Sequence, residues 1–357
     1  MNAVQQPSPG MDTVESVRQQ LLDRLEHGQL QSARRRLQGK AILVAAAFVV
    51  SYAFVLLGQV QPIAAAVGVV GLMAVAYASI SAVMHDANHH AMFENPRLSR
   101  LVGYWLDLFG ASSMVWCFKH NRVHHDFANV TDTDTDVQQS PFLRLTPHQR
   151  WRPWFRFQHL YAPILYGFIT VQTYAGDFLN LFSRRVKNQT MDFRPGLVDL
   201  TMFGLGKVLF VIWAVVVPVI LFGPVALLVA FVASWFVGLA LALTVQVAHA
   251  VDIVEFHENK DEIPADGFVK FQARVTADVT TRGFRGKVLR WFTGGLDRQL
   301  VHHLAPSLPH TLYPQLQQHI EAICAEHGAT YRSHPSVRAA LRSHFRFLRD
   351  LGQKPAF

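Results

Sequence analysis

The amino-acid sequence predicts an all-α integral membrane protein, in which four transmembrane helices form two hairpins and a helical cytoplasmic cap carries clustered histidines. Half of the 357 residues are hydrophobic and only 16% are charged, whereas about a quarter of residues are charged in soluble proteins. The segments 41–84 and 208–248 contain no Asp, Glu, Lys or Arg. Three short clusters outside these segments hold eight of the 18 histidines.

Each charge-free segment is long enough for two membrane-spanning helices. One span needs about 20 apolar residues, because a helix rises about 1.5 Å per residue across about 30 Å of hydrocarbon. Both segments break near their middle, at GQVQP (residues 58–62) and at GP (residues 223–224), which are typical of tight turns. Core helices of soluble proteins seldom run this long without a charge. We therefore expect spans at residues 41–58, 62–84, 208–223 and 224–248.

The basic residues predict the orientation of these spans. All 33 Lys and Arg lie in residues 1–40, 85–207 and 249–357, and the two hairpin tips carry none. The positive-inside rule then places both termini and the central segment in the cytoplasm, and the compact spans favour a bacterial inner membrane. Basic faces beside a bilayer attract anionic headgroups, so the net charge of +8 requires no nucleic acid partner.

The chain is expected to divide into an N-terminal segment (1–40), one membrane and catalytic domain (41–352) and a short tail (353–357). The N-terminal segment opens with polar residues, which excludes a signal peptide. Residues 11–40 are typical of an amphipathic basic helix on the membrane surface. Its apolar side would carry Val14, Val17, Leu21, Leu22 and Leu25.

The histidine clusters predict a metal site. They read HDANHH from His85, HNRVHH from His120 and QLVHH ending at His303. Residues i and i+4 share one face of a helix, so His85 with His89, and His120 with His124, could each chelate an ion, while the adjacent histidines could reach a second ion. This number of imidazoles exceeds one tetrahedral site, although imidazole alone does not choose between zinc, copper, iron and nickel. The candidate ligands are His85, His89, His90, His120, His124, His125, His249, His302 and His303.

Three other interpretations of these motifs are weaker. The first cluster resembles the zinc-protease pattern H-E-x-x-H, but Asp86 is shorter than the Glu, and the other clusters stay unexplained. A metal transporter, the alternative from another class, would place ionisable ligands within its spans rather than at their ends. The DTDTD run from Asp132 lacks the Gly and Glu of a calcium loop, which leaves a helix-capping turn or a support for His124 and His125.

Together the clusters resemble the three histidine boxes of the membrane fatty acid desaturases, over roughly residues 40–352. The boxes read HDANHHAMFENPRLSRLVGY, HNRVHHDFANVTDTDTDV and GGLDRQLVHHLAPSLPH. The third is similar to the Q-x-x-H-H form of the branch containing linoleoyl-CoA and front-end desaturases, in which Gln299 stands where other desaturases have a histidine. Asp297 and Val301 depart from the usual Asn and Glu of that box. Residues 324–331 (CAEHGATY) also resemble the C-terminal segment of the family.

The resemblance implies an O2-dependent enzyme that introduces a double bond into a fatty acyl chain at two iron ions on the cytoplasmic side. Fatty acyl hydroxylases and acetylenases share the boxes and remain the alternative. The acyl chain would be carried by coenzyme A, a lipid or an acyl carrier protein. The chain contains no His-Pro-Gly-Gly haem motif, so the electrons are expected from a separate ferredoxin or cytochrome b5.

Polar residues near the boxes are candidates to orient the ligands, because a metal-bound histidine usually donates its other ring N–H to a neighbour. These candidates are Asp86, Asn88, Asn121, Asn129, Asp252 and Gln299. A set of arginines could bind a phosphate-bearing headgroup, coenzyme A or a carrier protein, or could simply attract anionic lipid. They are Arg144, Arg150, Arg152, Arg156, Arg184 and Arg185.

Overall fold

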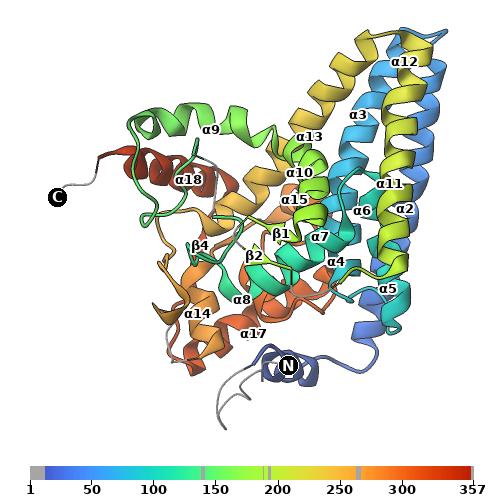
Figure 1. Ribbon diagram of the computed structural model, residues 1–357. Helices are drawn as coiled ribbons and strands as arrows, with labels where there is room; N and C mark the ends of the chain where they lie inside the picture. Colours follow the sequence, from blue (N-terminus) through green and yellow to red (C-terminus); the bar gives the residue numbers. More distant parts are fainter. Residues whose placement is uncertain (1–12, 138–140, 188, 192–193, 263–266, 355–357) are drawn as a thin grey trace.

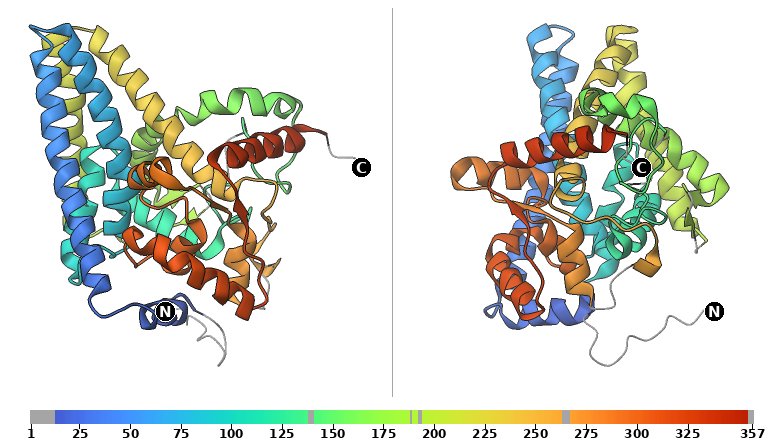
Figure 2. Two further views of the ribbon diagram at one scale, coloured as in Figure 1. Left: turned by 180° about the vertical axis from the view of Figure 1, so that it is seen from behind. Right: turned by 90° about the vertical axis from the view of Figure 1, so that its left-hand side faces the viewer.

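The computed structural model describes residues 13–137, 141–187, 189–191, 194–262 and 267–354, and these residues are mostly helical. Long helices stand together on one side of the molecule, and shorter helices form a body against their lower part (Figure 1). The turns at the upper ends of the long helices project beyond this body, as the view from behind also shows (Figure 2).

Within the described residues, four helices are long and apolar enough to cross a membrane, as the sequence predicted: Gln29–Leu57, Pro62–Asn88, Leu197–Phe222 and Val225–His249. Two of them contain π-helical turns. The second consists of α3 (Pro62–Ala78), the π-helix η1 (Ser79–Met84) and α4 (His85–Asn88), and the third of α11 (Leu197–Val211), the π-helix η4 (Ile212–Val216) and α12 (Val217–Phe222). The first is α2 (Gln29–Leu57) and the fourth is α13 (Val225–His249). The first and third helices begin before the predicted positions 41 and 208, because helical backbone continues into polar turns outside the apolar stretches.

Small residues let the helices α2 and α3 pack closely. A Cβ atom on Gly68 would lie 2.5 Å from the backbone nitrogen of Val55 and 2.6 Å from the carbonyl oxygen of Ser51. Such close backbone approach is the usual basis of helix association in a membrane, where burial of apolar surface gives little driving force. Pro62 begins α3, where its missing N–H costs nothing, and Gly223 adopts a positive φ of 72° at the turn before α13.

The body contains the remaining helices and two small sheets. β1 (Arg185–Val186) pairs antiparallel with β2 (Gln189–Thr190), and β3 (Asp278–Val279) pairs parallel with β4 (Ser333–His334). The helices before α11 are α1 (Val14–Asp23), α5 (Pro96–Gly103), α6 (Trp105–Leu108), α7 (Ser113–Cys117), the π-helix η2 (Phe118–His124), α8 (His125–Phe127), the 3₁₀ helix η3 (Pro153–Phe157), α9 (Gln158–Tyr166) and α10 (Ile169–Ser183). Those after α13 are η5 (Lys260–Glu262), α14 (Phe268–Val275), α15 (Gly283–Thr293), α16 (Gln299–Leu304), η6 (His310–Leu312), α17 (Tyr313–Glu326) and α18 (Val337–Gly352).

The expectation of one amphipathic helix over residues 11–40 is wrong for the described part of this segment. α1 begins after a capping box at Thr13, and the chain turns at Gly28, whose φ is +81°, before α2 starts. Val17 and Leu21 are fully buried in a core shared with α16 and α17. The apolar side of α1 therefore packs on the protein rather than on a membrane surface. Residues 11 and 12 lie outside the described residues.

The helices α9 and α10 turn apolar side chains outward. Leu160 and Ile164 on α9 and Leu179 on α10 are 67%, 56% and 71% exposed, although outward faces of helices in soluble proteins are normally polar. The neighbouring helix α18 follows the normal rule, with Arg342 and Arg346 exposed and Leu348 buried (Figure 1). The outer face of α9 and α10 therefore suits an apolar environment, whereas the outer face of α18 suits water.

Candidate metal centre

Seven predicted histidines come together in two adjacent groups. His85, His89, His120 and His302 form the first group, and His124, His249 and His303 form the second. Within each group, one ring nitrogen of each residue lies within 4.8 Å of those of all the others. His125 lies between the groups, with its ring centre 4.6 Å from that of His302 and 4.5 Å from that of His303.

Irregular helical turns produce this arrangement. α4 supplies His85 directly after the π-helix η1, His89 follows the last residue of α4, and the π-helix η2 supplies His120 and His124. A π-turn changes the angular spacing of side chains, and such turns occur frequently at functional sites. As a result, the pair His85 and His89 shares one group as predicted, whereas His120 and His124 belong to different groups.

His90 does not join either group. Its φ of 59° is left-handed, because the chain reverses at the end of α4, and its side chain is exposed. Burial and the nearby Arg100 guanidinium lower the pKa of His90, against the opposing effect of the Pro96 carbonyl. The ring lines a surface pocket rather than the histidine cluster. The turn therefore removes from the cluster a residue that the box pattern included.

In four of these histidines, the ring nitrogen that faces away from the groups has a polar partner. His303 Nδ1 lies 2.8 Å from Gln272 Oε1, and His124 Nδ1 lies 3.2 Å from Asp134 Oδ2. His249 Nδ1 and His302 Nδ1 meet the Val275 carbonyl oxygen at 3.1 Å and the Tyr313 hydroxyl at 3.3 Å, respectively. These bonds orient the rings and direct each Nε2 into the cluster, which is how metal-binding histidines are normally held.

The inward nitrogens meet the requirement of a metal site. In five histidines of the two groups, Nε2 is buried and has no hydrogen-bond partner among the described residues, which is unusual for buried polar atoms. Five converging, unpartnered imidazole nitrogens are the donor set that a divalent transition metal needs. The five are His85, His89, His124, His302 and His303.

Burial determines the protonation of these rings. Burial and the neighbouring imidazoles lower the pKa of His89, His302 and His303 well below the usual range, so they are neutral and able to ligate at pH 7. For His124, burial opposes the charged form, but the Asp134 carboxylate outweighs it and raises the pKa. Asp134 therefore supplies negative charge directly behind one candidate ligand.

The predicted supporting residues divide into two sets. Asp86 accepts hydrogen bonds from the backbone and ring of His310, at 2.9 and 2.8 Å, and its other oxygen lies 3.5 Å from His85 Nδ1. Gln299 Nε2 lies 3.0 Å from His249 Nε2, and Asn129 donates to the carbonyl oxygen of His249 at 2.9 Å. These three therefore contact the histidine cluster or its immediate supports.

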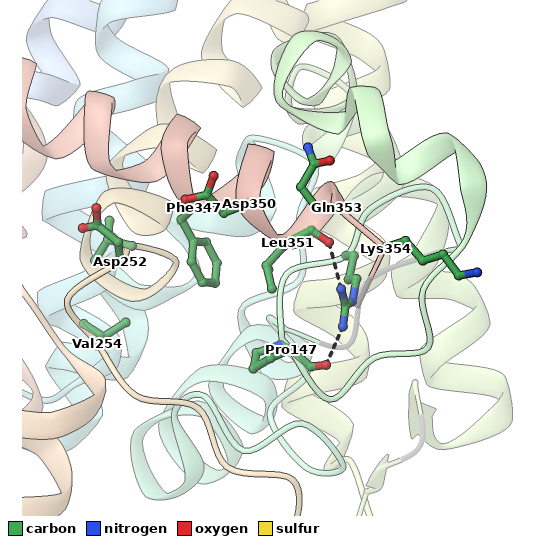
Figure 3. Close-up of a pocket in the computed structure, with 10 residues that line it drawn as sticks. Pro147, Asp252, Val254, Phe347, Asp350, Leu351, Gln353 and Lys354 are labelled. Carbon is green, nitrogen blue, oxygen red and sulfur yellow. Dashed lines mark hydrogen bonds between the residues drawn. The ribbon is translucent and has the colours of Figure 1, made fainter. Parts of the chain in front are cut away.

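The other predicted supports lie elsewhere. Asn88 and Asn121 bond to each other and line the surface pocket beside His90. Asp252 pairs with Ser343 and Arg346 and lines a second, larger pocket beside α18, where no member of the two histidine groups is found (Figure 3). Asp252 therefore contacts α18, and its role as a support for a metal ligand stays a prediction.

The arginines that the sequence offered as headgroup ligands lie in different environments. Arg144 is buried, and its guanidinium donates to the carbonyl oxygens of Pro147, Gln149 and Leu351, so it closes the end of α18 rather than facing a headgroup (Figure 3). Arg150, Arg152 and Arg156 are exposed, as a surface role requires.

Sequence reasoning missed two supports of the cluster. Gln272 is fully buried. Its amide donates to the carbonyl oxygen of His125 at 2.7 Å, and its Oε1 lies 2.8 Å from His303 Nδ1. His310 joins Asp86 to Lys40, whose Nζ lies 3.1 Å from His310 Nε2. No local pattern marks Gln272. His310 follows the third box closely, which was a usable signal.

Comparison with known proteins decides the family. A family model described as fatty acid desaturase matches residues 61–335, most of the chain. The chain belongs to the fatty acid desaturase family. It is 32% identical over 339 residues to an sn-1 linoleoyl-lipid 6-desaturase of Synechocystis sp., with 92% of each chain covered. This desaturase is therefore an oxidoreductase of the front-end branch, and its histidine groups are compatible with a di-iron site.

Two further relatives are longer. The desaturase is 32% identical over 288 residues to acyl-lipid (8-3)-desaturase B of Dictyostelium discoideum, covering 77% of this chain and 61% of the relative. It is 32% identical over 277 residues to an acyl-lipid (8-3)-desaturase of Physcomitrium patens, covering 76% and 57%. The desaturase spans about three fifths of the length of these two relatives.

Proposed function

We propose that this desaturase introduces a double bond near the carboxyl end of a lipid-linked acyl chain, at two iron ions held by the two histidine groups. The observation that carries the proposal is the convergence of buried, unpartnered Nε2 atoms in two adjacent groups. One ion would be held by His85, His89, His120 and His302, and the other by His124, His249 and His303, with His125 beside both. His90 is left out of this ligand set because it is exposed.

The chemistry of the substrate supports a metal oxidant. An unactivated methylene resists acid–base and nucleophilic attack, and bound iron would supply with O2 the oxidising power that its C–H bonds require. The reaction balances when two hydrogens of the acyl chain, two external electrons and two protons reduce O2 to two molecules of water. The protein keeps His302 and His303 neutral, holds these two rings through the Nδ1 contacts with Tyr313 and Gln272, and encloses the site away from bulk water.

The four apolar helices support a two-hairpin arrangement in the membrane. α2 packs on α3, α12 connects to α13 through a tight turn, and the tips of both hairpins carry no charge. We place the histidine cluster, at the opposite helix ends, and both termini on the cytoplasmic side of a bacterial inner membrane. The outward apolar face of α9 and α10 would then rest in the surface layer of the bilayer.

The carrier and the electron donor follow from different considerations. The relatives are named for linoleoyl-lipid and acyl-lipid substrates, which favours a lipid ester over coenzyme A or an acyl carrier protein. A separate ferredoxin or cytochrome b5 would deliver the two electrons.

The decisive experiment combines product analysis with metal analysis. Wild-type protein, His302→Ala and a surface control, His27→Ala, would be produced in cells fed 57Fe, and total fatty acids would be analysed by gas chromatography–mass spectrometry. We expect two irons per chain and a new unsaturated acid for wild type and His27→Ala, and the loss of both in His302→Ala. A hydroxylated or acetylenic product would favour the alternative. Retention of iron and product by His302→Ala would refute the ligand assignment.

A further inference from the structure

A polar pocket of about 270 Å³ lies directly beside the first and second histidine boxes. It is lined by Asn88, His90, Arg100, Asn121, Arg122 and Asp199, with apolar contacts from Met114 and Phe118. Asn88 is the last residue of the second apolar helix, and Asp199 lies in the first turn of the third. Because both helices end here, the pocket lies at the level where lipid headgroups meet a spanning helix.

The pocket and the metal cluster are built from the same turns of chain. Asn88 lies between His85 and His89 in sequence, and Asn121 directly follows His120. The amide of Asn121 donates to the backbone oxygen of Asn88 at 2.9 Å, which joins the two turns. The wall of the pocket and the histidine cluster therefore share these two turns of the chain.

His90 is turned into this pocket at a conformational cost. A non-glycine residue with a φ of 59° is uncommon, and such conformations cluster at functional sites. The left-handed turn directs its ring away from His85 and His89 and makes it part of the pocket wall. The strained turn thus gives the third histidine of the box a different position from the first two.

The polar groups of the pocket are held in place. Arg100 donates to Asp199 at 2.8 Å, to Ser113 at 3.2 Å and to Asn88 at 3.3 Å. Among the described residues, the Asn121 side-chain oxygen is buried without a hydrogen-bond partner. The guanidinium groups of Arg100 and Arg122 and the carboxylate of Asp199 also line the pocket. It therefore offers both donors and an acceptor to a polar ligand.

We propose that this pocket binds the polar end of the acyl substrate, its ester carbonyl and the adjoining headgroup, while the acyl chain runs past the metal cluster. This inference rests on the proposed function. An extended chain advances about 1.2 Å per bond, as three backbone bonds advance 3.3–3.6 Å in a polypeptide. A double bond six carbons from the carbonyl thus requires the carbonyl to lie only about 7 Å along the chain from the reacting methylenes.

The first test compares two histidines of one box. His90→Gln and His85→Gln would be purified in nanodiscs, and iron content, kcat and KM would be measured with a linoleoyl phospholipid. We expect His90→Gln to keep two irons and a kcat near that of wild type while KM rises about three- to tenfold, the effect of losing one hydrogen bond. We expect His85→Gln to lose iron. Loss of iron from His90→Gln, or an unchanged KM, would overturn the proposal.

The second test does not require turnover. In His90→Cys the introduced thiol would line the pocket, and its modification by a maleimide would be followed by peptide mass spectrometry, with Gln318→Cys on α17 as the exposed control. We expect linoleoyl phospholipid to slow modification at position 90 at least threefold and not at position 318. Protection by linoleoyl-CoA alone would keep the pocket and change the carrier. Absence of protection by either ester would refute the pocket, whereas an inactive, iron-free wild type would refute the proposed function instead.

Discussion

Gln272 contacts His125 of the second histidine box and His303 of the third. Replacing it should therefore weaken metal binding, although Gln272 lies outside all three boxes. In Gln272→Leu, His303 Nδ1 loses an acceptor at 2.8 Å and the His125 carbonyl loses a donor at 2.7 Å, both in a fully buried site. Leaving a buried polar group unpaired costs about 1–3 kcal/mol, so the two losses together cost about 2–6 kcal/mol. Loss of a hydrogen bond to a metal-binding histidine typically lowers metal affinity about 10- to 100-fold.

The assay is competition for iron against a graded series of chelators, with thermal unfolding measured on the same nanodisc samples. Gln272→Glu is the matched control, because its carboxylate still accepts from His303 but cannot donate to His125. We expect the Leu variant to release iron at a chelator strength about 10- to 100-fold lower and the Glu variant to lie close to wild type. An iron affinity equal to wild type in the Leu variant would refute the reasoning. Equal weakening in both variants would assign the effect to the contact with His125.

Two further predictions concern stability. Gly68→Ala should lower the stability of the desaturase in nanodiscs by about 1–3 kcal/mol, because the new Cβ would lie 2.5 Å from Val55 N. Gly204→Ala, where a Cβ meets nothing within 4 Å, should be neutral or stabilising, and an equal loss in both variants would contradict this account. Burial raises the pKa of Asp278 to about 6, although hydrogen bonds from Leu300 and Tyr331 oppose the shift. Between pH 4 and 6 the unfolded chain ionises at this position while the folded chain stays protonated, so stability should fall by about 3 kcal/mol relative to Asp278→Asn. Parallel melting-temperature profiles of wild type and Asp278→Asn across this range would show the reasoning to be wrong.

Composition and spacing were sufficient for the large features of the molecule. The four apolar helices follow from charge-free segments, since length and the absence of charge are properties of sequence alone. The histidine groups follow from the boxes because i and i+4 residues share a helix face, and His249 could be included because it ends the last apolar helix. The DTDTD run also gave a correct hint, since Asp134 now supports His124.

The finer features depend on backbone conformation that the sequence does not announce. The separation of His120 from His124 arises in the π-helix η2, and the amino-acid pattern does not mark where a helix takes on a π-turn. His90 leaves the cluster because one φ angle becomes positive, a conformation that only glycine adopts readily. Gln272 lies far from all three boxes along the chain and reaches them only after α14 packs beside α16. Tertiary packing therefore selects which polar residues support the site.

The free-energy cost of burying these unpartnered imidazole nitrogens favours a metal site over ordinary core packing. Five buried Nε2 atoms have no hydrogen-bond partner among the described residues, and each such atom costs about 1–3 kcal/mol. The total, about 5–15 kcal/mol, equals the usual net stability of a folded domain. Burial also suppresses protonation of His89, His302 and His303, so these three rings cannot escape the cost by becoming charged and attracting water. Coordination satisfies all five nitrogens at once and requires the neutral state that burial enforces, so the same packing that makes the cluster costly on its own prepares it to bind metal.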